Sequence, residues 1–111
     1  MEAFIQSLKA ENDALNRQAA ELRAENKGDE AVFYTVRANV YDICATVCRV
    51  HLSKGNLAAA DAIFDRFQNE WGAALETAKR QDNARKICVE ETKLEALADI
   101  RARYAAARSA S

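Results

Sequence analysis

The hydrophobic positions divide this chain into helical segments, and the most apolar segment runs from Asp29 to Ser53. On a helical wheel its apolar residues occupy more than half of the circumference, whereas a surface helix usually has an apolar arc of roughly 100° or somewhat more. These residues, together with Arg37 and His51, form two adjacent stripes. The first stripe consists of Val32, Val36, Ile43, Val47 and Val50, and the second consists of Phe33, Arg37, Val40, Tyr41, Cys44, Cys48, His51 and Leu52. We predict a long, mostly buried helix with two packing partners.

The segment before it, residues 2 to 27, has a heptad pattern. Leucines recur every seven residues, and a second set of positions alternates with them, giving the seam Ile5, Leu8, Asn12, Leu15, Ala19 and Leu22. This is the spacing of a coiled coil, in which a lone Asn at an a position, here Asn12, fixes the register of parallel two-stranded coils. Two interpretations remain open. The helix pairs with a second chain, which we take as the primary reading, or it folds back on its own domain.

Two further helices follow. The third is predicted from Leu57 to about Lys79, with apolar residues at alternating spacings of three and four. The hydrophobic phase then breaks, which favours a short turn capped by Asp82 or Asn83 over a kinked continuous helix. The apolar stripe of the fourth helix is Ile87, Leu94, Ala98 and Ala105, with Leu97 and Tyr104 alongside.

Glycines mark the other turns. Gly28 can end the first helix in the left-handed conformation with Asp29 capping the next, and Gly55 and Asn56 repeat these signals. The chain has 111 residues, no proline and only three glycines, so the predicted fold class is all-α. The predicted architecture is an N-terminal coiled-coil helix, residues 1–28, followed by a three-helix antiparallel bundle, residues 29–111. The long apolar helix lies between the third and fourth helices in this arrangement.

The net charge and the number of cysteines limit the classes of protein to which this chain can belong. The formal net charge is −1, which argues against a dedicated nucleic-acid binder. The odd number of cysteines, three, and the lack of a signal-peptide-length apolar run indicate a cytoplasmic protein with reduced thiols. No stretch approaches the ~20 apolar residues of a membrane span. A basic group at the predicted third turn could contact phosphates: Lys79, Arg80, Arg85 and Lys86.

The residues with most potential for chemistry are Cys44, Cys48 and His51, which share one helical face at i, i+4 and i+7. Cys88 could complete a tetrahedral set for Zn²⁺, so a metal-binding or thiol-redox regulator is one alternative. The other reading is that buried cysteines act as small hydrophobic residues. The chain has one His, no paired nucleophile and no glycine-rich phosphate loop. We therefore expect no enzymatic activity and no cofactor.

The central turn resembles a tetratricopeptide helix pair. Residues at the matching spacings are Val47, Cys48, His51, Gly55, Leu57, Ala60 and Phe64. The resemblance covers residues 44–70 and implies hairpin geometry and protein partners. His51 stands where that family has a tyrosine and Phe67 where it has an alanine, and no second copy follows at the 34-residue period.

These patterns together predict a non-enzymatic protein-interaction module. It is expected to self-associate through the heptad helix, as a homodimer or larger assembly, and to present the bundle to an unidentified protein partner. The metal or thiol-redox role is the first alternative. Weak nucleic-acid binding through the basic group near residues 79–86 is the second.

Overall fold

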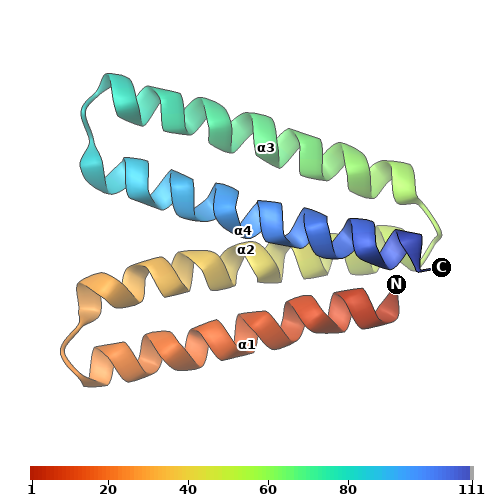
Figure 1. The fold of residues 1–111 in the computed structure, drawn as a ribbon, viewed down its shortest axis with the longest axis horizontal. Coiled ribbons are helices and arrows are strands. Elements are labelled where there is room, and N and C mark those ends of the chain that lie inside the picture. Colours follow the sequence, from red (N-terminus) through yellow and green to blue (C-terminus); the bar gives the residue numbers. More distant parts are fainter. Residues whose placement is uncertain (111) are drawn as a thin grey trace.

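The computed structural model describes residues 1–110 as four α-helices: α1 (Glu2–Ala24), α2 (Gly28–Leu52), α3 (Leu57–Arg80) and α4 (Ala84–Ser109). No strand occurs among these residues, so the all-α prediction is confirmed. Figure 1 shows α1 and α2 as one antiparallel hairpin and α3 and α4 as a second. The two hairpins meet where α2 and α4 cross, running in the same direction.

The order of the helices differs from the predicted one. We expected the helix 29–53 to lie between the third and fourth helices. Instead α4 lies between α2 and α3, and the most extensive helix pair is α1 with α2 (Figure 1). α2 and α3 touch less than α2 and α4 do, and they separate beyond their turn. The hairpin implied by the tetratricopeptide resemblance is therefore an open one.

The heptad seam of α1 packs against α2 of the same chain. Leu8 and Ala19 are fully buried there, and Asn12 Nδ2 donates a hydrogen bond to the backbone oxygen of Ala38 at 2.8 Å. The facing side of α2 carries three buried alanines, namely Ala31, Ala38 and Ala45. Because the distance between packed helices depends on the side chains at their contact, alanines allow α1 to approach closely. Asn12 thus aligns α1 with α2 inside one chain, and pairing of this seam with a second chain would need α1 to leave its place.

The turn between α1 and α2 uses a different residue from the one expected. Asn26 adopts the left-handed conformation, with φ 62°, and Gly28 is already the first residue of α2. Asn is the residue besides Gly that most readily takes this conformation at a helix end. Asp29 therefore lies inside the first turn of α2, where its charge favours the helix N-terminus, and makes no cap.

The other two turns follow the sequence signals. Gly55 has φ 70°, and the side chain of Asn56 caps α3 by accepting a backbone hydrogen bond at 3.0 Å. Asn83 caps α4 in the same way at 3.1 Å, after Asp82 with φ 51°. α3 and α4 are thus separate helices, as the phase break indicates.

The buried face of α4 agrees with the prediction at Leu97 and Tyr104 but differs along the predicted stripe. Ile87 and Leu94 are half-buried, but Ala98 and Ala105 are exposed. The apolar residues that α4 buries fully are Ala96, Leu97, Ile100 and Tyr104. The reason is that α4 is covered by α2 on one side and α3 on the other, so its buried arc spans both contacts.

The packing of α1 generates a first prediction. Leu8→Ala removes a fully buried side chain from the α1–α2 seam and is expected to lower the free energy of unfolding by about 2–5 kcal/mol. Leu22→Ala, at a half-buried position of the same seam, is the matched control and should cost clearly less. Urea unfolding followed by circular dichroism measures both. Equal losses for the two variants would contradict the burial described here.

Gly72 generates a second prediction. It lies inside α3 with helical backbone, and a Cβ added there meets no atom within 4 Å, so no neighbouring backbone approaches this glycine. Gly72→Ala should therefore raise the free energy of unfolding by roughly 0.5–1 kcal/mol through helix propensity. Gly55→Ala is the control and should be destabilising because of the positive φ at residue 55. A destabilised Gly72→Ala variant would show that glycine is needed there.

Candidate interaction surface

One of the two apolar stripes of α2 faces away from the rest of the molecule. We call it the outer stripe; it consists of Val32, Val36, Ile43, Val47 and Val50. Ile43 is 44% exposed and Val50 is 49% exposed, and these are the exposed large hydrophobic residues in the part of the chain that the structure describes. The remaining three are half-buried. We expected α2 to be mostly buried with two packing partners, but only its second stripe is largely covered, and Phe33, Arg37 and His51 within that stripe are half-buried.

The outer stripe lies opposite the side of α2 that holds α1. At 100° per residue, Ile43 points about 160° away from Ala45 and Tyr41, which are buried in the contact with α1 and α4. The positions that border the stripe on its solvent side, Asn39 and Thr46, are exposed and uncharged. The result is a continuous apolar surface along α2 with an uncharged polar margin. No helix among residues 1–110 is long and apolar enough to cross a membrane, and α2 is included in that statement.

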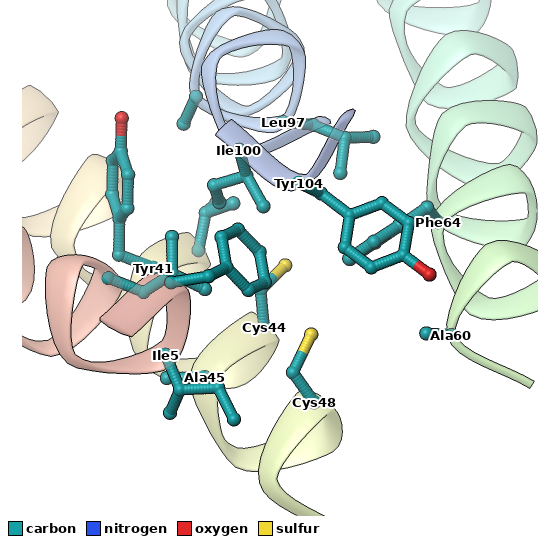
Figure 2. Close-up of a cluster of buried hydrophobic side chains, with 14 of the residues drawn as sticks. Ile5, Tyr41, Cys44, Ala45, Cys48, Ala60, Phe64, Leu97, Ile100 and Tyr104 are labelled. Carbon is teal, nitrogen blue, oxygen red and sulfur yellow. The ribbon is translucent and has the colours of Figure 1, made fainter. Parts of the chain in front are cut away.

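Two of the candidate metal-ligating thiols are part of the core. Cys44 and Cys48 are fully buried, and Figure 2 shows both sulfurs pointing into the cluster that contains Phe64, Ile100 and Tyr104. Burial raises the pKa of the Cys44 thiol to about 12, with a further contribution from Cys48, and raises the pKa of Cys48 to about 11. Both groups are thus held as neutral thiols, the form that neither ligates metal well nor attacks as a nucleophile.

Cys88 does not join these two thiols. It is exposed near the start of α4, in an open pocket of about 310 Å³ that also includes Phe33, Glu91 and Glu95. Phe33 is eleven residues before Cys44 on α2, which is roughly 16 Å along the helix axis. Among the residues that the structure describes, no group of three or more His, Cys, Asp or Glu side chains could hold a metal ion.

The second stripe also contains two polar residues, Arg37 and His51. The backbone oxygen of His51 accepts a hydrogen bond from the backbone nitrogen of Asn56 at 2.9 Å, at the end of α2. Arg37 Nε is buried without a hydrogen-bond partner among the described residues. The same is true of Oε2 of Glu90, whose other carboxylate oxygen lies 3.2 Å from Lys93 Nζ.

A polar cluster that the sequence did not reveal joins three helices. The hydroxyl of Tyr41 on α2 donates a hydrogen bond to Asp99 on α4, and Arg103 Nε lies 2.9 Å from the same carboxylate. Arg103 also reaches α1, with Nη2 3.4 Å from Glu11 Oε2 and Nη1 3.4 Å from the backbone oxygen of Ser7. Burial and the hydrogen bond to Asp99 raise the pKa of Tyr41 to about 12. Asp99 and Arg103 are four residues apart on α4, the spacing of an ion pair on one helix. Tyr41 and Glu11 come from other helices, so only the fold brings them to this pair.

The basic group lies on both sides of the turn between α3 and α4, and all four side chains are exposed. Lys79 Nζ is 3.6 Å from Glu76, and Arg80 donates to the Thr77 hydroxyl at 3.3 Å. Arg85 and Lys86 occupy the first turn of α4. The structure thus gathers Lys79, Arg80, Arg85 and Lys86 at one end of the molecule. Two of the four, Lys79 and Arg80, contact side chains of α3.

The buried thiols generate a prediction about alkaline stability. In the unfolded chain a thiol loses its proton near pH 9, but in the folded chain Cys44 and Cys48 keep theirs to about pH 12 and 11. Their contribution to stability is therefore complete below about pH 8 and is lost as the pH rises through 9 to 11. In this range each thiol should make the free energy of unfolding fall by up to about 1.4 kcal/mol more per pH unit.

The measurement is urea unfolding at pH 7 to 10, below the range in which Tyr41 ionises in the folded chain. For each protein, the free energy of unfolding at a given pH is expressed relative to its own value at pH 7. The cost of the cavity that a substitution leaves then cancels. The double variant Cys44→Ala, Cys48→Ala should show a shallower decline than the wild type, and Cys88→Ala, at an exposed position, should match the wild type. Identical declines in the double variant and the wild type would contradict this account.

No family model, curated protein or solved structure was found to match this chain.

Proposed function

We propose that this chain is a non-enzymatic protein-interaction module that binds through the outer stripe of α2. The observation that supports it is the exposure of Ile43 and Val50, together with three further β-branched residues on the same side of one helix. Apolar patches of this kind on soluble proteins commonly mark interaction sites. Covering Ile43 and Val50, each about half exposed, would contribute roughly 1 kcal/mol apiece.

The outer stripe is a better candidate than the seam of α1. The seam residues Ile5, Leu8, Leu15 and Ala19 are already buried by α2, so binding a partner there would cost the contacts that hold α1. Self-association through the heptad helix remains a prediction of the heptad alone. The outer stripe is available without any rearrangement of the fold.

The two alternatives have less support from the geometry. A metal or thiol-redox role would need Cys44 and Cys48, which are buried and protonated, and Cys88, which lies near the other end of α2. Nucleic-acid binding would depend on the basic group at one turn of a chain whose net charge is −1. Neither offers a surface comparable to the outer stripe.

The test is site-specific photo-crosslinking in the cells that produce the protein. A benzophenone amino acid at position 43 is expected to form covalent adducts with a bound protein. The same amino acid at position 62, an exposed alanine on α3, is the control and should form none. Equal adducts from both positions, or none from position 43, would contradict a docking role for the outer stripe.

A further inference from the structure

The two helical hairpins diverge toward the end of the molecule that carries the α1–α2 and α3–α4 turns (Figure 1). The open pocket of about 310 Å³ described above lies between them there. Phe33 of α2 lines one side of it, and α4 supplies the other lining residues, namely Cys88, Glu91, Thr92 and Glu95. We call it the inter-hairpin pocket. None of these residues belongs to the outer stripe, so the pocket is a separate surface.

The α4 side of the pocket carries two carboxylates that no cation compensates. Glu91 and Glu95 are exposed and four residues apart, so they lie on one side of the helix and repel each other. Neither side chain has a hydrogen bond or an ion pair among the described residues. The other two acidic residues of α4 each pair with a basic residue of the same helix, Glu90 with Lys93 and Asp99 with Arg103.

The acidic charge continues onto α2 beside Phe33. Asp29 and Glu30 in the first turn of α2 lie one helical turn before it, and neither has an ion pair among the described residues. Two basic residues also flank the pocket, Arg37 one turn after Phe33 and Arg85 in the first turn of α4. Four acidic residues against two basic ones leave the pocket and its borders with an excess of negative charge.

We propose that the inter-hairpin pocket binds a basic side chain, arginine or lysine, of a protein partner. The ring of Phe33 offers an aromatic surface on which a guanidinium or ammonium group is attracted. Glu91 and Glu95 accept its hydrogen bonds, and the bound cation removes the repulsion between them. The Thr92 hydroxyl donates to the backbone oxygen of Cys88 at 2.7 Å, so its own oxygen can still accept a hydrogen bond.

The size and the shape of the pocket favour a single side chain of a larger partner. Pockets for small molecules usually measure about 300–1,000 Å³ and enclose most of the ligand, whereas this one is small and open. Among the residues that the structure describes, no group of three or more potential metal ligands is arranged to hold a metal ion. The inference goes beyond the proposed function, because it adds a second surface that can fail or stand independently of the outer stripe.

The first experiment uses Cys88 to measure the charge of the pocket. Two methanethiosulfonate reagents, one with a trimethylammonium group and one with a sulfonate group, modify this exposed thiol, while Cys44 and Cys48 are buried. The measured quantity is the rate constant of the cationic reagent divided by that of the anionic reagent. Both reagents attack through the same thiolate, so the ratio does not depend on how much of the thiol is ionised.

The ratio is expected to be higher at Cys88 than at a reference thiol, Ala62→Cys in a Cys88→Ser background. Position 62 is exposed on α3, and its two acidic neighbours each pair with an arginine of α4. The double variant Glu91→Gln, Glu95→Gln should lower the ratio at Cys88 by roughly fivefold at low ionic strength, since the carboxylates attract one reagent and repel the other. The double variant Asp13→Asn, Glu21→Gln removes the same charge from exposed positions of α1 and should leave the ratio unchanged.

The second experiment measures binding with N-acetyl-arginine amide as the probe. The probe should slow the modification of Cys88 by a neutral methanethiosulfonate reagent, with a dependence on concentration that saturates. The amide of N-acetyl-citrulline has nearly the same shape without the charge and should protect much less. Phe33→Ala should weaken the protection by the arginine amide, because it removes the aromatic surface.

The third experiment places a benzophenone amino acid at position 88 in the cells that produce the protein, where an adduct with a protein partner is expected. A reagent ratio at Cys88 no higher than at position 62 would overturn the inference. So would equal protection by the two amides. Protection by the arginine amide without any protein adduct at position 88 would show that the cation is a free small molecule, which overturns the protein partner. Adducts at position 43 test the outer stripe alone, so the two surfaces are judged separately.

Discussion

The close packing of α1 on the alanine side of α2 is the contact on which the rest of the structure depends. Ala31, Ala38 and Ala45 let the two helices approach, and the Asn12 side chain fixes their alignment through the backbone oxygen of Ala38. This contact assigns one side of α2 to α1. The remaining sides of α2 are then available to α4 and to solvent.

α4 completes the core because it touches every other helix. It covers Cys44 and Cys48 with Ile100 and Tyr104, and Tyr104 stacks edge-on against Phe64 of α3. Arg103 extends from the same helix to Tyr41 and to α1, so a polar cluster supplements the apolar contact where three helices meet. The thiols serve here as small apolar groups, and burial in this core keeps both of them protonated.

The function we propose follows from what this arrangement leaves uncovered. α3 rests mainly on α4 and contacts α2 less, so part of the apolar surface of α2 stays uncovered within one chain. The apolar residues left over are β-branched, and the residues that border them on the solvent side, Asn39 and Thr46, carry no charge. Such a surface is suited to another helix more than to a small molecule or a nucleic acid.

The sequence by itself determined the helices, two of the three turns and the two stripes of α2. These depend on local physics: residue spacing, the left-handed conformation of Gly55 and the side-chain caps of Asn56 and Asn83. It could not say which stripe would be covered, because both are apolar at helical spacing and either could face α1. Nor could it reveal that Tyr41 joins Asp99 and Arg103, because only the last two are related by helical spacing. The tertiary structure decided both points, because small alanines on one side of α2 admit α1 closely, while the bulkier valines and isoleucine on the other side remain exposed or half-buried.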